Sequence, residues 1–361
     1  MMKNYIKSLF TLTLAITMVT ILGSQNAQAQ EEPTFSVSGT IDTYFRSAKF
    51  APETSFANDP GFSIGMANVV LSYEGEKHGF VADFVYGPRG ADAVFGSTED
   101  SSQIINQLYA YYNFSDSFTV TVGNFNTFLG YEVISPAANF NYSTSYMFSY
   151  GPFSHTGLKL DFTLSDDVTF MAAVMNPTDM TEANYALIAD NEGGPLDADG
   201  EPTPDGVLDY EAGDTYTYGL QLGLFGQYIN FLGGKDYSQI DFTGGIDITD
   251  GFFLGVNATS TTTTDSDNGF AGVALYPQVA LSDSFSLGAR YEYFEDKGGF
   301  LFDSGDQDNT SFTITGSYTS GNFILKPEFR VDTASDKFYL DNDAKATDSL
   351  ASFVVAAIYS F

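Results

Sequence analysis

Apolar and polar residues alternate with a period of two through most of the chain. From Phe285 to Tyr293 the odd positions are Phe, Leu, Ala, Tyr and Tyr, and Ser, Gly, Arg and Glu lie between them. Residues 215–224, 240–249 and 323–332 alternate in the same way. Because successive side chains of a strand point to opposite faces, this period predicts β-strands with one apolar and one polar face.

The last twelve residues, 350–361, form such a segment and end on Phe361. A transmembrane helix needs ~20 apolar residues, whereas a tilted membrane strand needs only ~9–11. A strand in lipid must pair all its backbone groups, which only a closed sheet allows. A soluble sandwich also alternates, but the strand lengths near ten residues and the aromatic strand ends favour a membrane. We therefore expect an all-β fold, a transmembrane antiparallel up-and-down β-barrel.

Short and long connections follow one another in turn. Tight turns such as Ser115-Asp116-Ser117 and Thr249-Asp250-Gly251 lead directly into apolar strand starts, and longer polar connections lie between them. A barrel with short periplasmic turns and long outer loops has this arrangement. We predict sixteen strands, with 14 or 18 as alternatives, and such a barrel encloses a water-filled lumen. The predicted strands are 34–46, 62–73, 79–87, 103–114, 118–126, 154–164, 168–176, 214–225, 227–234, 239–249, 252–261, 270–281, 285–295, 309–319, 322–332 and 347–361.

Residues 1–29 have the pattern of a cleaved secretory signal. Lys3 and Lys7 precede an apolar run over 9–22, and Ala27-Gln28-Ala29 follows as a small-residue cleavage site. The alternative is an amino-terminal membrane anchor. With the signal removed, residues 30–361 form one barrel domain, and we expect it in the outer membrane.

Composition excludes several other classes of protein. The chain has no cysteine, so disulfides and thiolate sites are unavailable. Its formal net charge of −32 argues against a nucleic-acid partner. No nucleotide-binding or metalloprotease motif occurs, so no cofactor is expected. Ser154 and His155 are adjacent, but neighbouring strand residues point to opposite faces, which argues against a hydrolytic pair.

Three segments carry a family resemblance. They are Val122-Gly123-Asn124-Phe125-Asn126-Thr127-Phe128-Leu129-Gly130-Tyr131-Glu132, Asn139-Phe140-Asn141-Tyr142-Ser143 and Gly151-Pro152-Phe153-Ser154-His155-Thr156-Gly157. Together with Gly39–Tyr44 and Gln107–Tyr111, they make the chain resemble the outer-membrane β-barrel porins of the OmpL-like type. The resemblance implies a pore with no catalytic residues. Its implied partners are outer-membrane lipid, small hydrophilic solutes and the barrel assembly machinery, for which Phe361 looks like the signal; homo-oligomerisation is left open.

The long connection 127–153 is the candidate constriction. In general porins, to which this chain is similar in architecture, the loop after the fifth strand folds into the lumen and narrows it. By that likeness we expect Tyr131, Glu132, Asn139, Asn141 and Tyr142 to line the constriction. The alternative is that this connection caps the outer rim.

Charged residues fall on the face expected to point into the lumen. The expected pore-lining residues are Asp42, Arg46, Asp83, Lys159, Asp161, Asp241, Asp247, Arg290, Glu292, Lys326, Glu328 and Arg330. With Asp332 added, acids outnumber bases, which predicts a mild preference for cations. The alternative is that wall pairs such as Lys159 with Asp161, or Arg330 with Asp332, neutralise each other and only brace the barrel.

The connection 177–214 is strongly acidic. It holds eleven Asp or Glu and no Lys or Arg. Its weak calcium candidates are Asp197, Asp199, Glu201 and Asp205. Their spacing does not complete a calcium-binding loop, so a solvated acidic loop is the preferred interpretation.

The sequence as a whole favours a porin that gives passive diffusion to small hydrophilic solutes or ions. Two alternatives from other classes stay open. One is a barrel enzyme of the protease or lipase type. The other is a structural or adhesive barrel with a plugged lumen.

Overall fold

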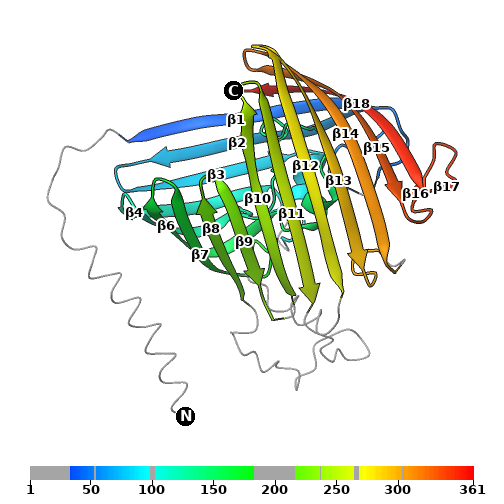
Figure 1. Cartoon of the computed structure of the whole chain (residues 1–361). Helices are drawn as coiled ribbons and strands as arrows, with labels where there is room; N and C mark the ends of the chain where they lie inside the picture. Colours follow the sequence, from blue (N-terminus) through cyan, green and yellow to red (C-terminus); the bar gives the residue numbers. More distant parts are fainter. Residues whose placement is uncertain are drawn as a thin grey trace, which may run out of the picture.

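Sixteen antiparallel strands form one closed barrel in the computed structural model, which describes residues 33–52, 54–97, 102–182, 216–235, 237–263, 268–302 and 305–361. Figure 1 shows the strands curving round into a single barrel. The barrel strands are β1 (Thr34–Arg46), β2 (Gly61–Glu74), β3 (His78–Tyr86), β4 (Ile105–Ser115), β5 (Phe118–Asn126), β6 (Ser154–Ser165), β7 (Val168–Met175), β8 (Thr217–Leu224), β9 (Gln227–Gly233), β10 (Tyr237–Thr249), β11 (Phe252–Thr263), β12 (Gly269–Ser282), β13 (Phe285–Lys297), β14 (Gln307–Ser320), β15 (Phe323–Ala334) and β18 (Ser349–Ser360).

The first and last strands close the ring. Each barrel strand pairs with its neighbour in the sequence, and β1 pairs with β18 in a register that sets Tyr44 opposite Ala356. Beyond that ladder, the backbone N–H groups of Gly39 and Phe361 each donate to the other residue's carbonyl, at 3.1 and 3.0 Å. The sixteen-strand prediction is confirmed, with boundaries that differ by at most three residues.

The two faces of the strands differ as the alternation predicts. On β13, Tyr291 and Tyr293 are exposed on the outside, whereas Arg290 and Glu292 are completely buried inside. The same holds on β15, where Phe329 is exposed and Lys326 is buried. The barrel therefore presents apolar side chains to lipid and polar side chains to its interior. Among the described residues, no helix has the length and hydropathy needed to span a bilayer.

Two short helices and one small hairpin in the connections were not expected from the sequence. Helix α2 (Pro88–Ala93) follows β3, and helix α3 (Tyr146–Tyr150) lies in the connection between β5 and β6. The side chain of Ser145 caps α3 by accepting the N–H of Phe148 at 3.0 Å. Strands β16 (Tyr339–Leu340) and β17 (Ala346–Thr347) form a separate hairpin. The predicted signal segment lies outside the described residues.

We expect Phe242→Lys, on the lipid face of β10, to destabilise the barrel by about 2–4 kcal/mol, because it places a charge against hydrocarbon. Its neighbour Thr243 faces the lumen, where its hydroxyl lies 3.1 Å from Asp241. Thr243→Lys serves as the matched control and should cost at most about 1 kcal/mol. Urea unfolding of the reconstituted barrel measures both. Equal destabilisation by the two lysines would contradict the assignment of faces.

Candidate functional site

The connection between β5 and β6, residues 127–153, lies inside the ring of strands, and we call it the lumen segment. The N–H of Gly130 donates to Asp241 on β10 at 3.0 Å, and the side-chain amide of Asn141 donates to Thr315 on β14 at 2.7 Å. In the order of the ring, β14 lies opposite β5 and β6. The segment therefore reaches across the lumen to the far wall instead of capping the rim.

Acidic side chains of the wall accept the backbone N–H groups of this segment. Glu328 on β15 accepts from Tyr142 at 2.7 Å and from Ser143 at 3.0 Å. Glu292 on β13 accepts the first two N–H groups of α3, at 2.9 and 2.8 Å. The first N–H groups of a helix have no partner within the helix, so a carboxylate is a favourable acceptor for them.

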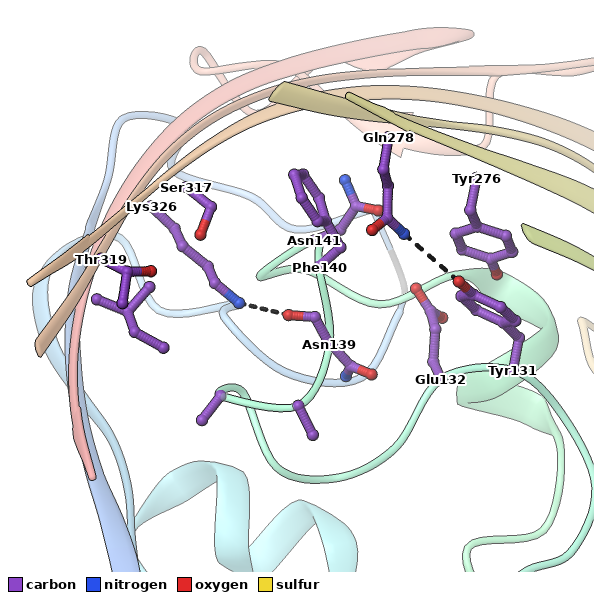
Figure 2. A pocket seen from close by; sticks show the side chains of 13 residues that line it. Tyr131, Glu132, Asn139, Phe140, Asn141, Tyr276, Gln278, Ser317, Thr319 and Lys326 are labelled. Atoms are coloured by element: carbon purple, nitrogen blue, oxygen red, sulfur yellow. Dashed lines mark hydrogen bonds between the residues drawn. The ribbon is translucent and has the colours of Figure 1, made fainter. Parts of the chain in front are cut away.

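Basic side chains of the wall donate to backbone carbonyls of the lumen segment. The ammonium of Lys326 donates to Pro136 at 2.8 Å and also to Asn139, the second contact being drawn in Figure 2. The guanidinium of Arg290 donates to the carbonyl of Ser143 at 2.7 Å and to that of Thr144 at 3.1 Å. The wall thus supplies both acceptors and donors for a backbone that has little regular secondary structure.

One buried ion pair joins the lumen segment to the wall. Arg290 lies 2.6 Å from Glu132, and the two side chains are 0% and 3% exposed. The other carboxylate oxygen of Glu132 accepts the N–H of Ser145 at 2.7 Å. Because neither charge is in contact with solvent, each depends on the other for compensation.

Both wall pairs weighed in the sequence are formed. Arg330 lies 2.7 Å from Asp332 and is also bonded to the carbonyl of Thr144 at 2.8 Å. Lys159 lies 3.2 Å from Asp161, but these side chains are 26% and 39% exposed. The first pair therefore braces the lumen segment, whereas the second faces water.

The other expected pore-lining residues have different surroundings. Asp42 accepts the hydroxyl of Tyr142, and Arg46 donates to carbonyls of the connection after β1. Asp83 accepts the side-chain amides of Asn68 on β2 and Asn106 on β4. Asp247 is exposed near the short turn that ends β10. The expected set is therefore split between anchors of the lumen segment and water-facing groups.

Sequence analysis missed the glycines of the wall that receive the segment's bulky side chains. A Cβ at Gly288 on β13 would lie 2.4 Å from the ring of Phe140, and one at Gly255 on β11 would lie 2.5 Å from the hydroxyl of Tyr131. In the same way Gly219 contacts Phe128 and Gly272 contacts Met147. Glycine at inward-facing strand positions was the signal available in the sequence.

Sequence analysis also missed Arg89 on α2. This buried side chain donates to the carbonyls of Ile134 at 2.9 Å and Tyr142 at 3.3 Å. Its guanidinium lies 4.3 Å from the centre of the Phe56 ring. The connections after β1 and β3 therefore also turn inward and support the lumen segment from one side.

A cavity of about 420 Å³ lies between the lumen segment and the walls of β12, β14 and β15. Figure 2 shows Tyr131, Phe140 and Asn141 of the segment close to Gln278 of the wall, with a dashed line joining Gln278 to Tyr131. The ring of Tyr131 stacks on that of Tyr276 on β12, with centroids 4.2 Å apart. The expected residues Asn139 and Glu132 also contribute to this lining.

Asp179 ties the connection after β7 to the end of the lumen segment. The residue as a whole is half-buried, but its carboxylate accepts the N–H groups of Phe153 at 2.7 Å and Ser154 at 2.9 Å. Desolvation of the carboxylate raises the pKa of Asp179 to about 6, although these two hydrogen bonds act to lower it.

The described part of the chain shows neither a hydrolytic Ser154–His155 pair nor a metal site. His155 shares a hydrogen bond of 3.0 Å with the hydroxyl of Thr127 and lies between the rings of Phe125 and Phe128, so it is not engaged with Ser154. No group of metal-ligating side chains occurs among the described residues. The calcium candidates Asp197, Asp199, Glu201 and Asp205 lie outside them.

A closed membrane barrel with a polar lumen, crossed by a segment from one of its own connections, defines a protein of the porin class. The chain belongs to the family described as "Putative beta-barrel porin-2, OmpL-like", whose model matches residues 34–361. It is an outer-membrane protein of the porin type, and this membership favours a channel over a barrel enzyme.

Solved structures agree with this fold. The chain is similar to a loop-deletion mutant of OmpT of Vibrio cholerae, with 12% identity, a TM-score of 0.54 and coverage of 92% of this chain and 100% of that one. For the trimer form of OmpT of Vibrio cholerae, the identity is 12% and the TM-score 0.52, with 92% of this chain and 100% of that chain covered. For a mutant of the Rh. blastica porin, the identity is 12% and the TM-score 0.50, with 91% of this chain and 100% of that chain covered. A search of curated protein sequences found no significant relative.

We expect Glu132→Ala to destabilise the barrel by about 3–5 kcal/mol, because it removes the ion-pair partner of the buried Arg290. Asp161→Ala is the matched control, since it removes one partner of a solvent-exposed pair and should cost about 0–1 kcal/mol. Urea unfolding in detergent measures both variants. If the two substitutions cost the same, the pair of Glu132 and Arg290 is not an anchor.

We expect stability to depend on pH through Asp179. Its folded-state pKa of about 6 lies above the ordinary value of 3.8, so the folded protein holds this proton more tightly than the unfolded chain. The resulting stabilisation is complete below the ordinary pKa and is lost as the pH rises through about 6, a loss of about 3 kcal/mol. Asp179→Asn keeps an acceptor and removes the titration.

Urea unfolding at pH 4 and pH 7 compares the natural chain with this variant. The natural chain should lose about 2 kcal/mol more than Asp179→Asn between these values, because at pH 4 the unfolded chain is already partly deprotonated. A pH response that is identical in the two proteins would show that this carboxyl is not the group responsible.

Proposed function

We propose that this porin gives passive diffusion to small hydrophilic solutes and ions, and that the lumen segment forms its constriction. The observation that carries the proposal is the span of the segment, which leaves β5 and is bonded to Asp241 on β10, Thr315 on β14 and Glu328 on β15. A solute that crosses the barrel has to pass beside it. The space left between segment and wall then sets the size limit.

The anchors imply a constriction of fixed geometry. Glu328, Glu292, Lys326 and Arg290 each make two hydrogen bonds with the backbone of the segment. Charge-assisted hydrogen bonds of buried groups are among the stronger ones in proteins. Size selection by a fixed gap follows, in place of a gate that opens and closes.

A mild cation preference is part of the proposal. Among the expected lining residues and Asp332, acids outnumber bases, and charge on a pore with low-dielectric walls attracts counter-ions. Most basic groups are bonded to the segment, and Lys159 is paired with Asp161. The exposed Asp247 at the short-turn end and the net charge of −32 add to the negative potential.

The partners in this proposal are outer-membrane lipid, the permeating solutes and the barrel assembly machinery, which would read Phe361. Homo-oligomerisation is included because OmpT of Vibrio cholerae, a structure with a similar fold, is described in a trimer form. No cofactor is required for diffusion down a gradient.

We expect deletion of Phe140 to Tyr146 to raise single-channel conductance, because it removes the part of the segment that reaches β14 and β15. Planar-bilayer recordings in potassium chloride measure the conductance. The reversal potential in a salt gradient gives the ion preference, and it should favour potassium.

Deletion of Asn342 to Lys345, the exposed tip of the hairpin β16–β17, is the matched control and should leave conductance unchanged. Unchanged conductance in the segment deletion would reject the constriction. A reversal potential that favours chloride would overturn the cation preference. A correctly folded natural barrel that passes no current would favour the plugged structural alternative.

A further inference from the structure

The cavity beside the lumen segment lies toward the end of the barrel with the short turns. Ser317 and Thr319, which line it, are close to Ser320, the last residue of β14 before the tight turn to β15. The segment itself forms the opposite wall through Tyr131 and Phe140. By the arrangement of turns and loops in outer-membrane barrels, this is the periplasmic side of the constriction.

Aromatic surfaces form one part of the lining. Tyr131 is held flat against Tyr276, with an angle of 21° between the ring planes. Phe140 is held by close contact with Gly288, where even a Cβ would clash. Figure 2 shows both rings at the cavity, with Tyr131 lying against Tyr276 of the wall. Their positions are fixed, so they offer a solute preformed apolar faces.

Neutral hydrogen-bonding groups form the other part. Among the described residues, the amide of Gln278 makes one long contact of 3.4 Å, to the hydroxyl of Tyr131, so it retains capacity for a ligand. Ser317 and Thr319 add hydroxyl groups that both donate and accept. The ammonium of Lys326 has three donors and uses two on backbone carbonyls.

Most of the charge in the lining is already engaged. Glu132 is paired with Arg290, and two of the three donors of Lys326 are held by carbonyls of the segment. A cationic solute would lose its hydration here without gaining a free carboxylate, and an anionic solute would meet an ammonium with one donor left. A neutral solute with many hydroxyl groups would instead match the amide, the hydroxyls and the aromatic faces.

We propose that this cavity is a binding site for a neutral, hydroxyl-rich solute of the size of a monosaccharide. Its volume of about 420 Å³ falls within the range of about 300–1,000 Å³ that is usual for small-molecule sites. The inference rests on the proposed function, because it names the class of solute that pauses beside the constriction on its way through the barrel.

The test measures binding of D-glucose to the purified full-length protein in detergent by equilibrium dialysis, which requires no current. We expect saturable binding that is at least about tenfold weaker in Gln278→Leu, where the loss of one or two hydrogen bonds is worth about 1.4 kcal/mol or more. Thr319→Val is a second variant at an exposed position. Gln107→Leu, at a half-buried position on β4 outside this cavity, is the matched control and should bind as the natural protein does.

Gluconate, which has a similar size and a carboxylate, should bind more weakly than glucose. Three results would overturn the inference: no saturable glucose binding, binding that is unchanged in both Gln278→Leu and Thr319→Val, or tighter binding of gluconate. A protein that conducts ions but binds no glucose rejects the site and leaves the proposed pore intact. Glucose binding by a barrel that passes no current rejects the pore and leaves the site intact.

Discussion

The need of an irregular backbone for hydrogen-bond partners governs the interior of this barrel. Residues 127–153 cross the lumen with only the short helix α3 as regular structure, so most of their buried N–H and C=O groups require external partners. The wall supplies them from charged side chains, with Glu328 and Glu292 as acceptors and Lys326 and Arg290 as donors. The charged side chains of the lumen therefore serve first to hold the segment in place.

These contacts reduce the effect of the buried charges on permeating ions. A side chain that is bonded to a backbone carbonyl or a buried carboxylate contributes less to the field felt by a passing ion. Arg290 and Arg330 are of this kind, whereas Lys159 and Asp161 are partly exposed to water. Selectivity in such a barrel depends on the few groups left in contact with solvent.

The strands were predictable because their signals are local. Alternation and turn residues are read within ten or so positions, and they gave sixteen strands and the correct face for Arg290 and Lys326. The path of the lumen segment was not readable from residues alone, because its contacts join distant positions, such as Asn141 with Thr315. The likeness to general porins supplied that expectation, but not the roles of Arg89 or Gly288.

The contacts of Phe140 with Gly288 and of Tyr131 with Gly255 also constrain the order of the steps by which the barrel assembles. The lumen segment precedes β10, β11, β13 and β15 in the chain, yet all of these strands hold it. The segment therefore cannot settle until the later half of the protein has been threaded into the bilayer. Its seating is a late step, and an unseated segment marks an immature barrel.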